Sequence, residues 1–371
     1  MSEIFKMPEL RIGELVARLQ IIQGGMGVGV SLAGLATAVA HAGGIGVISA
    51  IGLGLGQPQL DTDLATANER ALKQEICKAR SISDGIVGVN IMVALSDYET
   101  LVDCAVAESA DILFLGAGLP LRFSPHLPPD RLRGVPTRFA PIVSSDRAAR
   151  IIFQHWDRKF GRIPDAVVVE GPLAGGHLGF TKAALSDPAQ ALERLVPAIT
   201  ATVADFEQRY GQAVPVIAAG GIFDGGDIYR FIELGAAGVQ MGTRFVATRE
   251  CDAHDNFKQS YLEAKPEDIM IIESPVGLPG RAIRNSFLTE VAAGEKKPFK
   301  CSWKCLRTCD LEKAPYCIAS ALINARKGNL RHGFTFAGAN VHRVAEIIPV
   351  ADLMNTLAVE YKLAARLRAC A

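Results

Sequence analysis

Two stretches of the chain, VPVIAAGG (residues 214–221) and AGVQMGTRF (residues 237–245), decide the fold. Each begins as a run of mostly aliphatic residues and then reaches glycine, which is typical of a buried parallel strand followed by a tight turn. Six earlier stretches have a similar form: RLQIIQGG (18–25), GIGVISA (44–50), GIVGVNIMV (85–93), DILFLGAG (111–118), RFAPIVSS (138–145) and DAVVVEG (165–171). Because helical sequence separates these strands, we predict eight successive βα units.

Eight such units favour a closed barrel over an open doubly wound sheet. We therefore predict an α/β fold, a (β/α)₈ TIM barrel over residues 1–262, and a C-terminal lid over residues 263–371, where the βα rhythm stops. The lid should end in an amphipathic helix, VADLMNTLAVEYKLAARLRA. Asp187 and Pro188 are expected to open the helix that follows the sixth strand.

Composition limits the classes of function. Among 371 residues, Lys and Arg total 39 and Asp and Glu total 39, so no net charge favours nucleic acid as a partner. There is no secretory leader and no run of 18 uncharged apolar residues, which predicts a cytoplasmic protein without membrane partners. The eight cysteines are then expected to be reduced thiols or ligands and not a disulfide framework.

The turns after the seventh and eighth strands indicate a phosphate site. They read AAGG (218–221) and QMGT (240–243), at the two strand ends where such barrels commonly hold phosphate. Glycine lets backbone N–H groups converge on an anion, and Thr243 adds a hydroxyl. The alternative is that these glycines only make tight turns. The pair of turns together favours phosphate.

Two other strand ends could contribute to the same site. The first strand runs into Gln23, Gly24, Gly25 and Met26, where backbone without side chains could approach a flat ring closely. Asn90 is a polar residue in the otherwise apolar third strand. It could hydrogen-bond a bound cofactor, or it could cap a loop.

His177 is the candidate catalytic residue. It follows the sixth strand in a loop with glycines at 175, 176 and 179, which would let the imidazole project into the barrel mouth. A histidine there can serve as a general base or acid near neutral pH. A loop histidine bonded only to backbone is the alternative, and His126 is a weaker rival.

Five segments together resemble the nitronate monooxygenase family, also called 2-nitropropane dioxygenases, which includes a flavin-dependent enoyl-acyl-carrier-protein reductase branch. The segments are QGGMG (23–27), GVNIMV (88–93), EGPLAGGHLGF (170–180), PVIAAGGI (215–222) and GVQMGTRF (238–245). The similarity covers roughly residues 18–250, and GRAIRN (280–285) looks like a further family element.

The resemblance implies a barrel that binds FMN, with His177 as the catalytic residue. The residues expected around the cofactor are Gln23, Gly24, Gly25, Met26, Asn90, Glu170, Gly175, Gly176, Ala219, Gly220, Gly221, Gln240, Met241, Gly242 and Thr243. In nitronate monooxygenases the histidine acts as a base toward the nitroalkane. In the reductase branch NAD(P)H is the co-substrate, and the histidine assists as a proton donor or orients a thioester.

The lid carries a cysteine cluster that is unusual for the family. Cys301, Cys305, Cys309 and Cys317 have the spacing C-x₃-C-x₃-C-x₇-C. Four thiolates are the usual ligand set of an iron–sulfur cluster or a structural zinc, although this spacing matches neither common pattern. The alternatives are a metal centre, four reduced thiols, or reactive thiols near the flavin.

The sequence therefore predicts an FMN-dependent oxidoreductase of the nitronate monooxygenase type that oxidises alkyl nitronates. The alternative enzyme is an enoyl-thioester or other ene reductase that uses NAD(P)H or an electron carrier, with an iron–sulfur cluster as an optional second cofactor. A flavin-binding redox sensor without turnover is a third class. The expected partner is a small molecule, a nitronate or an enoyl thioester, and a homodimer is compatible with the sequence.

Overall fold

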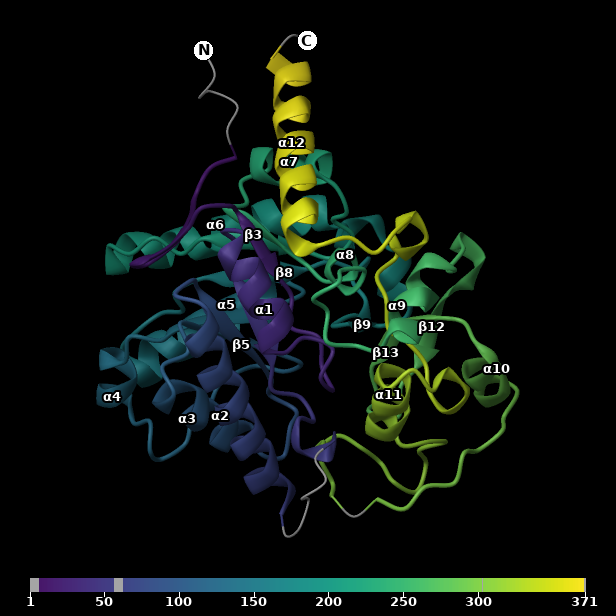
Figure 1. Cartoon of the computed structure of the whole chain (residues 1–371). Coiled ribbons are helices and arrows are strands. Elements are labelled where there is room, and N and C mark those ends of the chain that lie inside the picture. Colours follow the sequence, from purple (N-terminus) through teal and green to yellow (C-terminus); the bar gives the residue numbers. More distant parts are fainter. Residues whose placement is uncertain (1–6, 57–62, 302, 370–371) are drawn as a thin grey trace.

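The computed structural model describes residues 7–56, 63–301 and 303–369, and it contains the predicted eight parallel strands (Figure 1). The prediction of an α/β barrel is confirmed, and each strand lies inside the stretch that the sequence indicated. The strands are β3 (Ile21–Gln23), β4 (Gly46–Ser49), β5 (Val87–Met92), β6 (Ile112–Gly116), β7 (Arg138–Val143), β8 (Val167–Glu170), β10 (Val216–Ala219) and β11 (Gly238–Met241).

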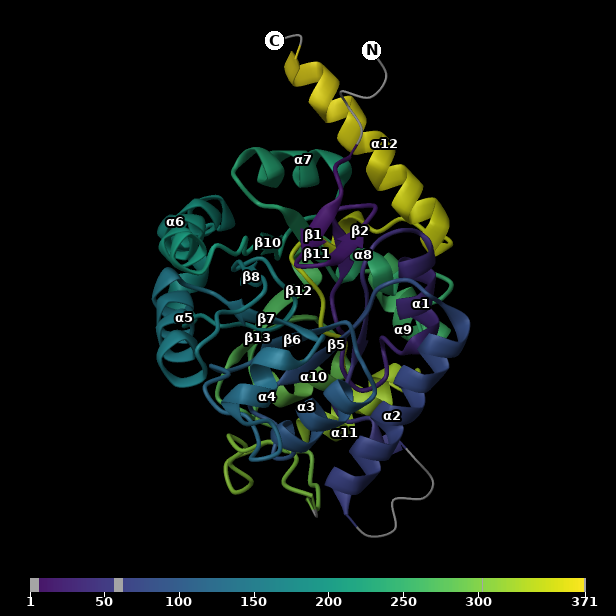
Figure 2. The same ribbon diagram turned by 90° about the vertical axis from the view of Figure 1, so that its left-hand side faces the viewer.

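The sheet closes on itself. Its order is β3-β11-β10-β8-β7-β6-β5-β4, and a parallel bridge between Ile22 and Ile45 joins the two ends. Figure 2 shows α1 to α6 arranged around the strands. The helices of the barrel are α1 (Ala33–His41), α2 (Leu64–Ile82), α3 (Tyr98–Ala107), α4 (Pro129–Gly134), α5 (Asp146–Phe160), α6 (Leu192–Tyr210), α7 (Gly225–Glu233) and α8 (Thr243–Val246).

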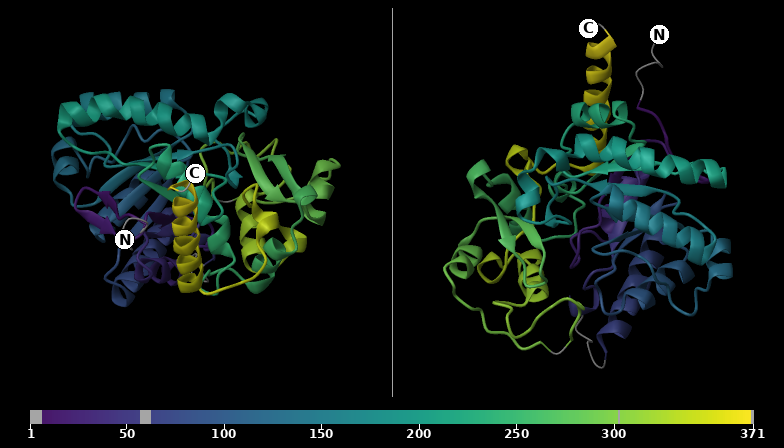
Figure 3. Two further views of the ribbon diagram at one scale, coloured as in Figure 1. Left: turned by 90° about the horizontal axis from the view of Figure 1, so that it is seen from above. Right: turned by 180° about the vertical axis from the view of Figure 1, so that it is seen from behind.

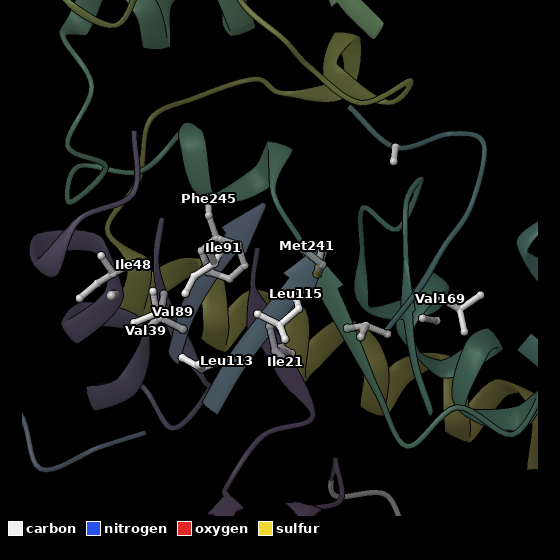
Figure 4. Close-up of a cluster of buried hydrophobic side chains, with 14 of the residues drawn as sticks. Ile21, Val39, Ile48, Val89, Ile91, Leu113, Leu115, Val169, Met241 and Phe245 are labelled. Atoms are coloured by element: carbon white, nitrogen blue, oxygen red, sulfur yellow. The ribbon is translucent and has the colours of Figure 1, made fainter. Parts of the chain in front are cut away.

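Alternate strand residues serve two cores, as the two-residue period of a strand requires. Ile21 and Val169 belong to the layer between strands and helices, part of which Figure 4 shows. Ile22 and Val168 point instead into the barrel interior. There they meet Leu10 from a short hairpin, β1 (Leu10–Ile12) with β2 (Leu15–Ala17). Both faces of the strands are therefore buried, which explains why the sequence reads as continuous apolar runs.

One helix start differs from the prediction. Asp187 and Pro188 open only a 3₁₀ turn, Pro188–Gln190, whose Ala189 N–H is bonded by the Asp187 carboxylate. The α-helix itself begins at Leu192 after Ala191 and runs through Pro197 to Tyr210. Asp187 and Pro188 are local signals for the start of a helix, and the 3₁₀ turn uses both of them. The crossover from β6 to β7 is only partly helical, because α4 spans just Pro129–Gly134.

A lid covers the barrel mouth (Figures 1 and 3). Its strands β12 (Ile269–Glu273) and β13 (Pro279–Ile283) pair with β9 (Gly176–His177), which belongs to the loop after the sixth barrel strand. The sequence did not predict this small sheet. The lid has its own apolar core, which includes Phe287 and Phe334. Its helices are α10 (Ser286–Ala292) and α11 (Ile318–Arg326), whereas α9 (Asp255–Leu262) precedes the lid and packs in the core of the barrel.

The terminal helix α12 (Val350–Ala369) is present as predicted, but it does not belong to the lid. It packs against α7 and α1 on the outer ring of the barrel, and its last turns project beyond the body in Figure 1. Gly225 of α7 explains the close approach, because a Cβ there would lie 2.2 Å from the Tyr361 backbone nitrogen. The chain thus returns to the barrel after the lid.

Candidate active site

A cavity of about 340 Å³ lies between the carboxyl ends of the strands and the lid. Apart from Gln23, every residue expected around a cofactor lines it, and His177 lines it as well. Those residues are Gly24, Gly25, Met26, Asn90, Glu170, Gly175, Gly176, Ala219, Gly220, Gly221, Gln240, Met241, Gly242 and Thr243. Strand ends spread over more than 200 residues of sequence are therefore brought into one site, as parallel strands of a barrel require.

The register of the parallel strands places Glu170, Ala219 and Gln240 at the same height in the barrel. Glu170 is paired with Ala219, and Ala219 is paired with Gln240 on the next strand. Gly220 and Gly221 follow with φ of 92° and 90°, a left-handed backbone that favours glycine. A Cβ on Gly220 would lie 2.9 Å from the Gly171 carbonyl oxygen. The two loops can therefore lie this close only because glycine stands there.

The lid holds these loops from above. Arg281 of β13 is buried, and its Nη1 donates to the carbonyl oxygens of Pro172 and Ala174 at 2.6 and 2.5 Å. The Gly338 N–H donates to the Thr243 hydroxyl at 3.0 Å. That hydroxyl keeps its own hydrogen to donate toward a ligand. The GRAIRN segment that the sequence singled out thus supports the glycine loop.

Two glutamines at strand ends have different roles. Gln23 does not line the cavity, because its side-chain amide bonds both the N–H and the C=O of Val47 and joins β3 to β4. Its predicted contact with a cofactor stays a prediction, and its side-chain amide is already used within the barrel. Gln240 does line the cavity, and its Oε1 is buried without a hydrogen-bond partner among the described residues. An unpaired buried amide oxygen is suited to a donor on a bound ligand.

His177 sits where barrel and lid meet. The His177 backbone pairs with Gly280 in the lid sheet, and the His177 Nε2 lies 2.7 Å from the Ser274 hydroxyl. The Phe336 ring packs edge-on at 5.0 Å between ring centroids. Burial lowers the pKa of His177 to about 4, so the imidazole is neutral at neutral pH. A neutral ring of this kind is a weak base and a good hydrogen-bond donor.

We assign the proton of the neutral His177 ring from the contacts of Ser274. The Val276 N–H faces the Ser274 hydroxyl oxygen at 3.5 Å, a weak contact that favours the hydroxyl hydrogen pointing toward His177. Nε2 then accepts, and the proton of the neutral ring stays on Nδ1. Nδ1 has no hydrogen-bond partner in the described part of the chain. It is therefore free to bond a ligand.

Glu170 is the second titratable group in the cavity. Burial raises its pKa to about 7, and no hydrogen bond or ion pair to it is found among the described residues. A carboxyl group in this position can hold a proton near neutral pH and can donate a hydrogen bond. The resemblance placed Glu170 at the cofactor without assigning it this property.

Sequence reasoning missed most of the cavity wall that lies away from the barrel strand ends. These residues are mainly apolar, and no local motif marks them, because long-range packing alone brings them to the cavity. They include Leu95, Phe257, Tyr261, Leu306, Ile318, Leu322 and Phe336. Of the four clustered cysteines only Cys305 lines the cavity. Within the described ranges, no group of three or more His, Cys, Asp or Glu side chains has the arrangement of a formed metal site.

Fold and cavity define a (β/α)₈ barrel with a ligand-sized cavity at its mouth. The family model described as nitronate monooxygenase matches residues 11–113 and 96–360. The chain belongs to the nitronate monooxygenase family, and the prediction from the sequence segments is confirmed.

Two curated relatives differ in what they are named for. The chain is 29% identical over 276 residues to (3aS,4S,5R,7aS)-5-hydroxy-7a-methyl-1-oxo-octahydro-1H-indene-4-carboxyl-CoA dehydrogenase of Mycobacterium tuberculosis, with 74% of this chain and 66% of that one covered. It is 37% identical over 132 residues to a probable nitronate monooxygenase of Staphylococcus aureus, which covers 35% of each chain. The matches thus span just under two thirds of the first relative and about a third of the second.

Solved structures agree with the fold. FabK from Thermotoga maritima has a TM-score of 0.72 and 28% identity, and the match covers 95% of this chain and 96% of that one. A nitroalkane oxidase from Streptomyces ansochromogenes has a TM-score of 0.71 at 23% identity, with 95% and 98% covered, a likeness of fold alone. In the described residues, no helix is both long and apolar enough to cross a membrane.

Proposed function

We propose that the chain is an oxidoreductase that binds FMN in the cavity at the barrel mouth. Family membership supports this, and the cavity fits the group in two respects. The loops at Gly220 and Gly221 have the left-handed backbone of an anion cradle, and the unpaired Gln240 Oε1 offers an acceptor at the adjacent strand end. When bound, FMN would supply the capacity to accept and pass on hydride.

The residues of the chain would bind the cofactor, exclude water and contact the substrate. The loops after β10 and β11 would hold the phosphate, with the Thr243 hydroxyl as a donor. Asn90 and Gln240 would bond the polar parts of the cofactor from the strand ends. The lid, with Phe336 and Leu322, would exclude water from the site. His177 would contact the substrate.

We propose that the substrate is an enoyl thioester or a similar conjugated carbonyl compound, and not a nitronate as first expected. The observation that carries this choice is His177, which is buried and neutral, with Nε2 occupied by Ser274 and Nδ1 open. The Nδ1–H would donate to the substrate carbonyl oxygen, where negative charge develops during hydride addition. A group with a pKa of about 4 is poorly suited to removing a proton from a nitroalkane.

The surroundings of His177 support the same choice. Leu95, Ile318 and Leu322 extend the cavity under the lid as an apolar wall, which suits a substrate with an apolar body. One relative is named for a carboxyl-CoA substrate. Nitronate oxidation stays the second candidate because the family model and another relative are named for it, and because a preformed nitronate needs no base.

Anaerobic stopped-flow absorbance of the purified flavoprotein separates the candidates. We expect NADH or NADPH to reduce the flavin and a long-chain enoyl-CoA to reoxidise it, while propyl nitronate leaves it oxidised. Reduction by propyl nitronate without reoxidation by enoyl-CoA would reverse the choice. Failure of all these compounds to reduce the flavin would favour the non-catalytic redox sensor. NAD(P)H as co-substrate, a cytoplasmic location and a homodimer stay predictions.

A further inference from the structure

The lid contains a long irregular segment at the edge of the cavity. Residues 293–317 connect α10 to α11 and, where the structure describes them, contain one isolated bridge and no helix or regular strand. A stretch of that length without secondary structure is uncommon inside a compact fold. It nevertheless supplies part of the cavity wall through Cys305 and Leu306. Interactions other than backbone hydrogen bonds between strands are needed to hold this segment in place.

The fold of this segment gathers its cysteines. The Lys297 N–H donates to the Pro315 carbonyl oxygen at 2.7 Å, which closes a loop that contains three of the four. Cys317 follows two residues after the closure, at the start of α11. Leu306 and Cys309 pack against the same lid core as Tyr316 and Ile318. Both ends of the cysteine motif are therefore brought to one side of the lid.

The four thiols of the motif are close enough to interact electrostatically: Cys305 with Cys301, Cys309 and Cys317, and Cys309 with Cys301 and Cys317. All four are partly buried. The described cysteines outside the motif lie elsewhere: Cys77 is exposed on α2, Cys104 is buried on α3, and Cys251 is buried next to α1. Cys77 and Cys104 are near each other, but among the described cysteines only the lid motif gathers more than two thiols.

We propose that Cys301, Cys305, Cys309 and Cys317 are the four ligands of one metal centre, a zinc ion or an iron–sulfur cluster. On binding, four S–H bonds are lost, four protons go to solvent, and four sulfur–metal bonds form. The positive charge of the metal offsets the negative charge of the four thiolates. The sulfur atoms are not at ligand spacing in this structure, so the loop has to tighten around the metal.

The centre would fix the wall of the active cavity. The cysteine segment is tied to the loop after β5, because the Ser96 N–H donates to the Cys305 carbonyl oxygen at 3.1 Å. The neighbouring residues Leu95 and Leu306 form an isolated antiparallel bridge. Leu95, Cys305 and Leu306 all line the cavity. A metal that orders the cysteine loop would therefore also set the position of this wall.

Metal analysis of the full chain purified without oxygen tests the proposal. We expect about one zinc per chain, or about four iron with about four acid-labile sulfides if the centre is a cluster. Cys305→Ser and Cys309→Ser should each lose most of the metal, while Cys77→Ser should retain it. Less than about a tenth of these amounts in the wild-type chain, after reconstitution with zinc or with iron and sulfide as well, would overturn the proposal. Equal metal content in all variants would also overturn it.

Two further measurements keep the result independent of the proposed function. Flavin content and its visible spectrum are recorded on the same samples, and we expect FMN to stay bound in the cysteine variants because its loops lie on the barrel. Limited proteolysis should cut residues 293–317 faster in Cys309→Ser than in the Cys77→Ser control. Metal without flavin would support the centre and contradict the FMN assignment. Flavin without metal would contradict the metal centre and support the FMN assignment.

Discussion

The two halves of the cavity are built in different ways. On the barrel side the walls are largely backbone, because glycines at 24, 25, 220, 221 and 242 stand at the strand ends. On the lid side the walls are side chains from separate segments, such as Ile318, Leu322 and Phe336. Backbone loops on a rigid sheet suit a cofactor that stays bound, and side chains on irregular segments suit a substrate that enters and leaves. Changes in the two halves should therefore have different consequences.

The largest effect is expected at His177, where the halves join. His177→Ala should lower kcat by about 10²–10⁴-fold, because it removes the donor to the reacting substrate while the barrel half is intact. FMN should stay bound. Steady-state turnover and the flavin spectrum measure the two quantities. His126→Ala, an exposed loop histidine, is the control and should leave kcat within about twofold of wild type. Wild-type turnover in His177→Ala would remove the residue from the mechanism.

In the barrel half, Gly220→Ala should weaken FMN binding by about 10–10²-fold. Its φ of 92° strains any other residue, and the added Cβ would press on the Gly171 carbonyl and displace the cradle. Gly235→Ala is a matched control, because Gly235 has φ of 99° but open space around its Cβ position. FMN fluorescence titration of the flavin-free proteins measures the affinity. Equal losses in both variants would mean that general strain, and not the cradle, is responsible.

The two titratable groups of the cavity should make stability depend on pH with opposite sign. Burial raises the pKa of Glu170 to about 7 from 4.5, so its folded form keeps a proton that the unfolded chain has released, and stability is lost as pH rises through that window. Burial lowers the pKa of His177 to about 4 from 6.5, so stability is lost as pH falls through that window. In wild type the two dependences oppose each other.

Substituting one of the two groups at a time separates the two pH dependences of stability. Glu170→Gln should leave a chain whose stability rises between pH 4.5 and 6.5, and His177→Asn one whose stability falls, each on the order of 2 kcal/mol. Urea unfolding of the flavin-free proteins across this range measures the slopes. Parallel slopes in the two variants would show that at least one group is not buried as described.

In the lid half, Ser274→Ala should lower kcat by about 10-fold and leave KM nearly unchanged, because Ser274 positions His177 without touching substrate. Ser274→Thr, which keeps the hydroxyl, should restore most of the rate. The ¹⁵N chemical shifts of His177 should report a proton on Nδ1 in wild type and a mixture of tautomers in Ser274→Ala. Unchanged ¹⁵N shifts in the alanine variant would show that Ser274 does not position His177.

The smallest effect is expected from the apolar lid wall. Leu322→Trp should raise KM by about 5-fold for a long-chain enoyl-CoA and much less for a short one, because it narrows the part of the cavity that the lid lines. Leu363→Trp, on the exposed face of α12, is the control. If KM rises equally for both chain lengths, Leu322 does not line the part of the cavity that holds the acyl chain.

The same division explains what could be predicted from the sequence. Strands and cofactor loops repeat one local pattern, so eight strands and the residues around Gly220 could be located from runs of aliphatic residues and glycines. Ser274 could not be found in this way, because it lies 97 positions from His177 and only the fold brings them to 2.7 Å. The bonds from the Gln23 amide to Val47 could not be predicted either, since a motif does not tell which way an amide turns. The lid strands have no alternation clear enough to mark them.

The central claim is that the barrel half of the cavity holds one FMN. Acid release of the chromophore from the purified chain, followed by mass spectrometry and quantification against protein, tests it most directly. We predict FMN at about one per chain, or full occupancy after titration of the flavin-free protein with FMN. FAD as the bound flavin, or no binding of FMN by a folded chain, would contradict the account.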